Sequence, residues 1–598
     1  AALSTNTTAS YNTAVGHGSL NVNTTGANNT AVGYQSLDAN TTAHNNVAVG
    51  YQALAANTSG TRGVAVGYAA LDANTTAADN TGIGNHALGA NTTGTRNTAL
   101  GSYALDDNTT ASDNVGVGYN ALGANTTGQR LVSVGSAALD ANTTGDDNTA
   151  VGYNSLGGNT TGASNTAIGS YALDANTTGS FNIAIGREAL TANTTGTQNT
   201  AVGTYALDAN TTASYNTAVG YDALSANTGN YNTAFGRQAL RDNQGGERNV
   251  AVGYDALLVA NASYNTAIGM HALNAATTGA SNTAVGYNSL VANTTASNNT
   301  AIGYSAMGAN TVGTENVAVG HEALTTNVDG SQSTAIGFQA LYYQEPASAV
   351  DMNNTAVGYY AGRSINTGTL NTLVGANTGD AITTGFDNVA MGRSALTTED
   401  TGRKNVAIGS SALESQNSDA DNYNVAVGFE AGKEVTTGIQ NTLVGALAGD
   451  SFTDADYNVA VGVGVLSGDT LGSKSTAIGY DSLSTQNFTT ATDALNTAVG
   501  FEAGKAVTTG VQNTLVGANT GDAVTTGDAN VAVGYAALGT NDVGGYNTAI
   551  GNSALGLNVD GSRSVAVGHG ALYTQEPASA VNMNNTAVGY IAGYAVTT

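Results

Sequence analysis

A seventeen-residue repeat runs through the sequence and constrains its fold more than any other feature. The string Asn-Thr-Ala-Val-Gly and its variants recur, and the closing glycine falls at Gly16, Gly33 and Gly50 and onward in steps of seventeen. There are 34 such glycines through Gly589, with a few steps of 16, 19 or 21 residues. A unit this short cannot enclose a core of its own, so successive units must stack and bury a shared one.

The three residues before each repeat glycine alternate in type and predict a short β-strand. The residue just before the glycine is apolar throughout, the residue three before it is usually Thr, Val or Ile, and the residue between them is mostly Ala. Period-two alternation is typical of a strand with one buried face. We predict that the apolar row faces the core together with the leucine that stands four residues after the glycine in 26 units. The predicted core residues are Val15, Leu20, Val32, Leu37, Val49 and Leu54.

Seven units carry glycine in place of that leucine, and they test the core assignment. The seven are Gly362, Gly379, Gly432, Gly449, Gly504, Gly521 and Gly593. In each of them the usual asparagine three positions later becomes apolar, as in Ile365 and Phe452. We predict that this apolar side chain replaces the volume of the lost leucine, because protein cores are packed to nearly constant density.

Asparagine precedes the glycine by four residues in 29 of the 34 units, and most leucine-type units have Asn-Thr-Thr-Gly or a close relative at the next corner. Stacked turns would align these amides into hydrogen-bonded ladders, while the corner glycines Gly16, Gly33 and Gly50 supply dihedral angles that other residues resist. The predicted fold is an all-β parallel β-solenoid, or β-roll, with about 34 coils of about 17 residues. At roughly 4.8 Å per stacked strand it would measure on the order of 160 Å.

The repeats are organised differently in the two halves of the chain. Residues 1–337 form a uniform shaft of seventeen-residue repeats, whereas residues 338–598 show a higher-order repeat of about 70 residues with inserted loops. The string Gln-Glu-Pro-Ala-Ser-Ala-Val occurs at 344–350 and again at 575–581, each time in a 21-residue coil, and we expect both copies to form surface bulges. We also expect the repeat array to be incomplete at both ends, since capping coils are not recognisable there.

Composition excludes several classes of function. The chain has 15 Lys and Arg against 42 Asp and Glu, a net charge of −27, and no Cys. Such an acidic chain cannot neutralise a phosphate backbone or an anionic membrane, and no apolar run approaches the ~18 residues of a membrane span. Thiolate chemistry and disulfides are excluded. Because nearly every polar residue type recurs with the repeat, we expect no catalytic constellation, no cofactor and no metal site.

Three sets of titratable residues are candidate sites. The six histidines show no zinc-ligand spacing, and we expect them to be outward-facing and solvated. The carboxylates that recur one residue after the core leucine could form a calcium ladder, but the nonapeptide of calcium-binding β-rolls does not occur, so we favour a charged face that resists aggregation. The pair Asp146 and Asp147 could serve a glycosidase only at a suitable separation. The recurring carboxylates are Asp38, Asp72, Asp106, Asp140 and Asp174, and the histidines are His17, His44, His86, His271, His321 and His569.

An aromatic stripe is the remaining candidate site. Thirteen units place Tyr just after the repeat glycine. These rings could stack on sugars and so bind a carbohydrate, or they could simply cover the coil corner and protect strand edges, which we favour. The candidate residues are Tyr34, Tyr51, Tyr68, Tyr119, Tyr153 and Tyr221. The Asn-Thr-Thr corners also match the acceptor sequence for N-linked glycosylation.

The repeat resembles those of known attachment proteins. The segments Asn29 to Gly33 and Asn46 to Gly50 resemble the Asn-Ser-Val-Ala-Ile-Gly repeats in the heads of trimeric autotransporter adhesins. The full unit is similar to repeats in bacteriophage tail fibres and in large surface proteins of algal viruses. The resemblance implies intertwined or side-by-side trimers of left-handed parallel β-rolls. The adhesin repeat is shorter than seventeen residues, so the coil cross-section and the trimer contacts are left open.

These observations together favour a fibre. We expect an extracellular, cell-surface or virion-surface shaft, a structural spacer and adhesin that forms a homotrimer and reaches a host-cell glycan or protein receptor through a tip outside this sequence. A thin core supports the prediction of a homotrimer, since each coil offers only two large apolar residues. One face of the coil therefore needs a partner. The alternatives are an ice- or lattice-binding solenoid and, behind it, a polysaccharide-degrading spike. We expect neither nucleic acid binding nor membrane insertion.

Overall fold

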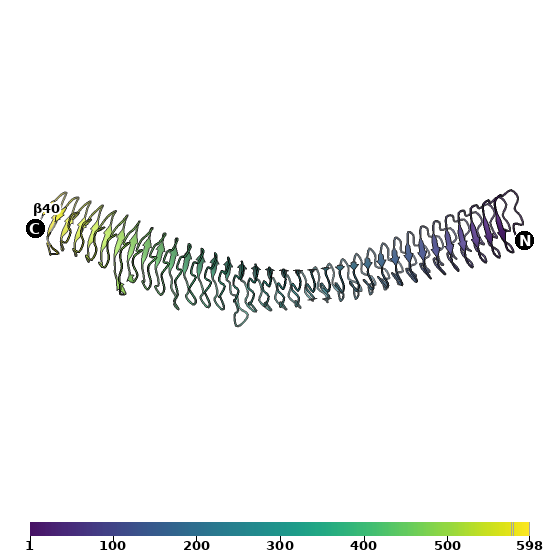
Figure 1. Cartoon of the computed structure of the whole chain (residues 1–598), viewed down its shortest axis with the longest axis horizontal. Helices are drawn as coiled ribbons and strands as arrows, with labels where there is room; N and C mark the ends of the chain where they lie inside the picture. Colours follow the sequence, from purple (N-terminus) through teal and green to yellow (C-terminus); the bar gives the residue numbers. More distant parts are fainter. Residues whose placement is uncertain (576, 578, 597–598) are drawn as a thin grey trace. The chain divides into compact units, whose positions relative to one another are not determined.

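The computed structural model of the chain describes residues 1–575, 577 and 579–596. It is an all-β parallel β-solenoid, as predicted, and no helix occurs in the described residues. The chain divides into two compact units, Ala1–Thr295 and Ala296–Thr598. Each unit is a stack of coils with one three-residue strand per coil (Figure 1). The change of repeat type at 337/338 lies inside the second unit and stays a prediction about sequence organisation.

The strands have nearly constant length and spacing. Those of the first unit are β1 (Thr13–Val15), β2 (Thr30–Val32), β3 (Val47–Val49), β4 (Val64–Val66), β5 (Thr81–Ile83), β6 (Thr98–Leu100), β7 (Val115–Val117), β8 (Val132–Val134), β9 (Thr149–Val151), β10 (Thr166–Ile168), β11 (Ile183–Ile185), β12 (Thr200–Val202), β13 (Thr217–Val219), β14 (Thr233–Phe235), β16 (Val250–Val252), β18 (Thr266–Ile268) and β19 (Thr283–Val285). Those of the second unit are β20 (Thr300–Ile302), β21 (Val317–Val319), β22 (Thr334–Ile336), β23 (Thr355–Val357), β24 (Thr372–Val374), β25 (Val389–Met391), β26 (Val406–Ile408), β27 (Val425–Val427), β28 (Thr442–Val444), β29 (Val459–Val461), β31 (Thr476–Ile478), β33 (Thr497–Val499), β34 (Thr514–Val516), β35 (Val531–Val533), β36 (Thr548–Ile550), β37 (Val565–Val567) and β39 (Thr586–Val588).

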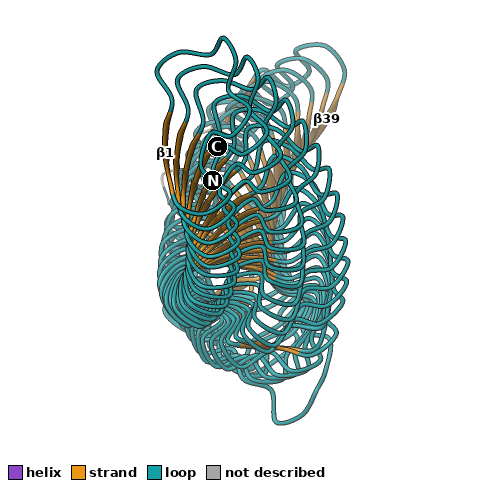
Figure 2. Cartoon of the chain, turned by 90° about the vertical axis from the view of Figure 1, so that its right-hand side faces the viewer, coloured by secondary structure: helices purple, strands orange, loops and turns teal. Residues whose placement is uncertain are grey.

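Within each unit, each strand pairs in parallel with the strand of the next coil, in a register that the repeat sets. Thr30 pairs with Val47, and Val32 pairs with Val49. Longer coils keep this register, since Thr334 pairs with Thr355 across a 21-residue step. Figure 2 shows the strands gathered on one wall of the coils, with turns completing each circuit. Two-residue strands also pair on another wall: β15 (Asp242–Asn243) with β17 (Val259–Ala260), β30 (Gly472–Ser473) with β32 (Thr492–Asp493), and β38 (Thr574–Gln575) with β40 (Ala595–Val596).

The strand residue that faces the core is the central alanine, so the prediction that the apolar row before the glycine is buried was wrong. Ala31 and Ala48 are fully buried, whereas the predicted core residues Val15, Val32 and Val49 face outward: Val15 and Val49 are 58% and 36% exposed, and Val32 is partly exposed. The reason is the limited space inside the coil, next to the leucine row. β5 has a glycine in place of the alanine, and a β-carbon built on Gly82 would lie 2.9 Å from the Ala87 carbonyl oxygen and 3.3 Å from Leu71 Cγ. The interior next to the leucine row therefore accommodates a methyl group but not a branched side chain.

The other predicted core residues are confirmed. Leu20, Leu37 and Leu54 are buried, and their backbones adopt φ values of 46°, 50° and 53°. In six of the seven glycine-type coils the apolar replacement for asparagine is fully buried, as predicted; the six are Ile365, Ile382, Val435, Phe452, Val507 and Val524. Val596, the seventh, is only partly buried.

Two asparagine ladders form the polar part of the core, which confirms the predicted amide stacking. At the corner, the amide of Asn40 donates to Asn23 Oδ1 at 2.7 Å and to the Ala43 carbonyl at 3.3 Å. Before the strand, the side chain of Asn29 donates to the same carbonyl at 2.9 Å and accepts from the backbone N–H of Asn46 at 3.0 Å. Buried amides are thus bonded both to the next coil and to the backbone, as burial requires.

The repeat glycine is fixed by the close approach of successive coils. Gly16, Gly33 and Gly50 have φ values of 129°, 139° and 144°, in the region that side chains resist. A β-carbon on Gly33 would lie 2.2 Å from the carbonyl oxygen of Gly50. No other residue fits this corner, which confirms the predicted role of these glycines.

The long coils carry their extra residues outside the strand ladder. In each of them a glutamine takes the place of the corner asparagine and continues the asparagine ladder. Each has a buried glutamine at the corner: Gln344, Gln416, Gln486 and Gln575. Gln344, for example, donates to Asn327 Oδ1 at 3.3 Å and accepts from Asn354 at 3.0 Å. Of the predicted bulge at 344–350, residues 347–350 are exposed, whereas Gln344 and Pro346 are buried. In the second copy, residues 579–581 are exposed, while residues 576 and 578 lie outside the described part.

Candidate functional site: the outward strand face

The outward face of the strand wall is the most distinctive surface of the molecule. We define it as the first and third residues of the three-residue strands listed above. The first residue is always Thr, Val or Ile, and the third is always Val, Ile, Leu, Phe or Met. No charged side chain stands at any of these positions, although the chain has 57 charged residues in total, 15 Lys and Arg and 42 Asp and Glu. Charged residues are therefore excluded from this face in every one of these strands.

This face is open to solvent along both units. Leu100, Phe235 and Val588 are 46%, 52% and 70% exposed, and the other third-position residues are exposed or partly exposed. Parallel pairing places like positions of neighbouring strands side by side, as for Val49 and Val66. First and third residues lie roughly 6.6 Å apart along a strand, and strands lie about 4.8 Å apart. The result is a regular two-row array of methyl groups and threonine hydroxyls, a contiguous apolar surface of the kind that marks an interaction site.

An aromatic ladder lies next to this face, just past the repeat glycine. The rings of Tyr34 and Tyr51 stack with centroids 5.2 Å apart and planes 8° apart, and Tyr51 and Tyr68 stack at 5.0 Å and 5°. In this stretch each ring face covers its neighbour, so the rings present mainly their edges outward. Self-stacking supports the interpretation that the tyrosines cover the coil corner.

The other three tyrosines of the predicted carbohydrate stripe have different surroundings. Tyr119, Tyr153 and Tyr221 contact rings of adjacent coils edge-on, at interplanar angles of 86°, 81° and 85°. The partner rings come from the position one residue further along the repeat: Tyr103, Tyr171 and Tyr205. The structure therefore brings the six predicted tyrosines into one stripe but not into one continuous stack, and sugar binding there stays a prediction.

Histidines are part of the same ladder, which the sequence analysis missed. His17 stacks on Tyr34 at 5.4 Å, and His321 lies between Tyr304 and Phe338 at 4.8 and 5.2 Å. His86, His271 and His569 also contact aromatic rings of neighbouring coils, whereas His44 is exposed at another corner. The available signal was that five of the six histidines occupy the two positions after the repeat glycine. Within the described residues, no group of three His, Asp or Glu side chains could hold a metal ion.

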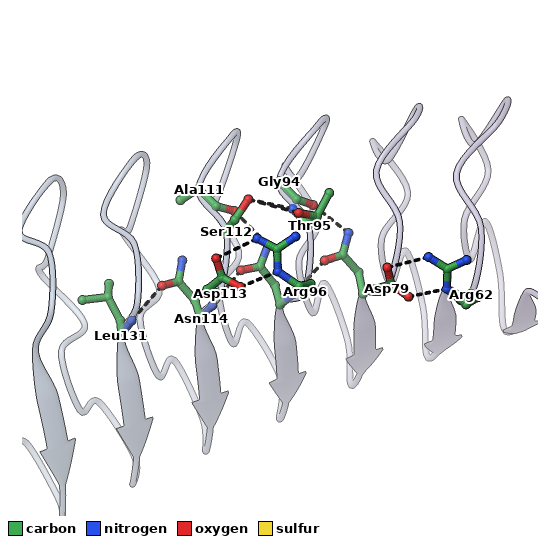
Figure 3. A network of polar contacts seen from close by, with 12 residues as sticks. Arg62, Asp79, Gly94, Thr95, Arg96, Ala111, Ser112, Asp113, Asn114 and Leu131 are labelled. Carbon is green, nitrogen blue, oxygen red and sulfur yellow. Dashed lines mark hydrogen bonds and ion pairs between the residues drawn. The ribbon is translucent and has the colours of Figure 1, made fainter.

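An alternating charge ladder lies on the other side of the strand wall, two residues before the strand. Arg62 and Asp79 form a bidentate pair at 2.5 and 2.7 Å, and Arg96 and Asp113 form another at 2.5 and 2.8 Å (Figure 3). In each pair the guanidinium lowers the pKa of the carboxyl and gives it a fixed partner in the next coil. These pairs are largely exposed, so each adds little to stability. They mark where the charge-free face ends.

Asp146 and Asp147, considered as a glycosidase pair, are bound to one arginine. Arg130 contacts Asp147 Oδ1 at 2.5 Å and Asp146 Oδ2 at 3.5 Å. The arginine lowers the pKa of Asp147, whereas a general acid needs a raised pKa. The arrangement resembles the Arg–Asp ladder and does not favour glycoside hydrolysis.

The recurring aspartates after the core leucine are half-buried. Burial raises the pKa of Asp72, Asp106, Asp140 and Asp174 above the ordinary value. Asp174 accepts a hydrogen bond from the side chain of Asn154, in the preceding coil, at 2.5 Å. These carboxylates thus fold against the coil surface, and the predicted charged face is only partly solvated.

Comparison with known proteins gives no family for this chain. No protein-family model matches it, and no curated protein matches its sequence. The described residues include no helix long and apolar enough to cross a membrane. Function must therefore be argued from the surfaces of the solenoid.

Proposed function

We propose that this protein is the shaft of a fibre on a cell or virion surface, where it acts as a structural spacer in attachment to a host-cell glycan or protein. A repetitive solenoid suits this role because each coil adds length without adding a new fold. Polar side chains recur by position along the coils, so receptor recognition would reside in another part of the fibre. For the same reason we propose a structural role without enzymatic activity.

We propose further that three chains associate side by side through the outward strand face. The observation that carries the proposal is the exclusion of charge from the first and third strand positions of every coil. Isolated apolar residues are common on protein surfaces, but an uninterrupted apolar row is not. A strip of this width that extends over many coils offers an area in the range of obligate interfaces. The charge ladder at its margin would then form the polar rim.

The same face also supports a second candidate, binding to ice or another lattice. Exposed threonine and valine rows repeat at a fixed spacing on this face, as a lattice-binding surface requires. The corner Thr-Thr pairs do not provide such an array, because the first threonine of each pair bonds to the next coil, as Thr41 Oγ1 does to the Thr58 carbonyl at 3.2 Å. The apolar third row favours self-association over a lattice.

The oligomeric state tests the association. Mass per unit length, measured by scanning transmission electron microscopy, should equal three 59.1 kDa chains per length of one stack. A variant with Ile83→Lys, Leu100→Lys and Val134→Lys places charge on the face and should yield single chains. The control variant Thr42→Lys, Ser59→Lys and Thr76→Lys adds the same charge at exposed corners and should stay associated.

The two candidate functions give different results. A wild-type protein with one chain per length, and with thermal hysteresis that the face variant loses, would replace the fibre with the lattice-binding function. Localisation is tested separately with antibodies against the shaft, which should label intact source cells or virions. Labelling only after lysis would contradict the surface role.

A further inference from the structure

The asparagines of the corner ladder carry the acceptor sequence for N-linked glycosylation but are buried. Thirteen corners of the first unit have Asn-Thr-Thr or Asn-Thr-Ser with an asparagine that is at most 2% exposed. They are Asn23, Asn40, Asn57, Asn74, Asn91, Asn108, Asn125, Asn142, Asn159, Asn176, Asn193, Asn210 and Asn293. A glycan would be attached to the amide nitrogen of such a side chain. Whether the folded coil can accept it is a question of geometry.

Asn91 shows how the amide nitrogen is used. Its Nδ2 donates to Asn74 Oδ1 at 3.1 Å and to the Gly94 carbonyl at 3.0 Å, while its Oδ1 accepts from Asn108 Nδ2 at 2.9 Å. Both amide hydrogens are therefore committed to the ladder. Glycosylation would replace one of them with a sugar ring and would place that ring in a fully buried position. The cost includes a lost hydrogen bond, an unsatisfied buried acceptor and steric overlap with the adjoining coils.

Other acceptor sequences lie on the surface and serve as an internal comparison. Asn261 in Asn-Ala-Ser and Asn487 in Asn-Phe-Thr are exposed. The hydrogen bonds of both reach Oδ1: Asn261 accepts from the backbone N–H of Gln244 at 3.3 Å, and Asn487 accepts from Thr470 Oγ1 at 3.1 Å. A sugar on either side chain would extend into solvent and leave the corner ladder in place.

We infer that the native coil and N-glycosylation of the corner asparagines exclude each other, so that this protein folds where no oligosaccharyltransferase modifies it. That enzyme acts on unfolded chain, before the ladder forms. In a glycosylating compartment, modified corners would remain unfolded, whereas exposed acceptors such as Asn261 and Asn487 would tolerate a glycan. The inference concerns where the chain folds and does not depend on the proposed fibre function.

Expression in two compartments tests the inference. The full chain is produced in bacterial cytosol and, behind a cleavable signal peptide, through the secretory pathway of cultured eukaryotic cells. A corner-silent variant changes the third residue of all thirteen buried corner acceptors to Ala, as in Thr93→Ala, which is exposed and leaves Asn91 in place. A matched control changes Ser263→Ala and Thr489→Ala and so removes two surface acceptors and no corner acceptor.

The expected result is a β-rich, protease-resistant chain from bacteria and a glycosylated, protease-sensitive chain from the secretory pathway. The corner-silent variant and an oligosaccharyltransferase inhibitor should each restore resistance, whereas the surface control should not. If the variant fails to fold in bacteria, the inhibitor alone provides the test. Peptide mapping that finds a glycan on Asn91 in protease-resistant protein would overturn the inference, as would a secreted wild-type chain that folds without the inhibitor.

Discussion

The side chain of Leu373 occupies the space that a leucine at position 362 would fill, because a β-carbon on Gly362 would lie 2.8 Å from Leu373 Cδ1. The next glycine-type coil shares this leucine: a β-carbon on Gly379 would lie 2.9 Å from Leu373 Cδ2. Leu373 stands in β24 where most strands have the inward alanine. In a pair of glycine-type coils, one leucine in the strand thus replaces the leucines that the two turns lack. The turn position, where leucine otherwise has a positive φ, is occupied by glycine. Leu443 and Leu515 repeat the arrangement between the other two glycine pairs.

Replacement of Leu373 with alanine should destabilise both neighbouring coils. The side chain is fully buried, and the turn positions 362 and 379 beside it carry glycine, so we expect a loss of about 2–5 kcal/mol. Hydrogen exchange of the β23 to β25 amides would measure the loss locally, which suits a repeat protein whose unfolding need not be all-or-none.

A double-mutant cycle separates this volume exchange from general damage. Gly362→Leu alone should destabilise by steric overlap, but together with Leu373→Ala it should cost less than the sum, with a coupling of about 0.5–3 kcal/mol. Strict additivity would contradict the shared space between positions 362 and 373.

The strand positions could be predicted from the sequence, but the buried face could not. Alternation shows that two faces differ, and here both rows were non-polar, alanine in one and valine or isoleucine in the other. Pattern alone favours the larger side chains as core. The choice is made by the distance across the coil, set at β5 by Leu71, which has no signature in a single repeat.

Substitutions in β2 test the observed orientation. Ala31→Val should destabilise by about 1–3 kcal/mol, because branched atoms would press on the leucine row. Val32→Thr, on the outward face, should change stability by no more than about 0.5 kcal/mol. Local hydrogen exchange around β2 would compare the two. The reverse order of costs would restore the valine row to the core.

The outward face was missed for a related reason. Once the apolar row is assigned to the core, its lack of charge needs no further explanation; only its exposure makes that lack informative. The histidines looked unrelated in the sequence because they occupy different positions of the repeat. His17 and His86 nevertheless occupy adjacent positions, and both side chains contact the aromatic ladder. Side-chain reach, rather than sequence position, determines such contacts.

Gly33→Ala should disrupt its coil strongly. The new methyl group would overlap the Gly50 carbonyl, and φ is 139°, so we expect a cost of more than about 4 kcal/mol. Gly539→Ala provides the control, since its nearest contact would be a 3.2 Å approach to the Ala536 carbonyl. Limited proteolysis should detect opening near Gly33 and none near Gly539. Equal protection in both variants would contradict the close approach of coils.

A buried carboxyl, Asp469, should make stability rise as pH falls from neutral. Its side chain accepts from Gly472 N–H at 3.0 Å, from Phe488 N–H at 3.3 Å and from Gln486 at 2.6 Å, yet burial is the larger effect and raises its pKa. The unfolded pKa is about 3.9, so between this value and the folded pKa the folded state binds more protons. The free energy of unfolding therefore increases on acidification through that range and levels off below about pH 4.

Asp469→Asn should remove this dependence and stabilise the protein at pH 7 by about 1 kcal/mol. The corresponding residue before another long coil is already an asparagine: Asn558 accepts from Gln575 at 3.3 Å and donates to the Gly561 carbonyl at 2.9 Å. Thermal unfolding between pH 4 and 7 would measure both effects. Asp79→Asn serves as the control of opposite sign, because Arg62 lowers the pKa of Asp79 and its contribution is lost as pH falls. A loss of stability at pH 7 in Asp469→Asn would show that the ionised carboxylate, with its three donors, is the favoured form.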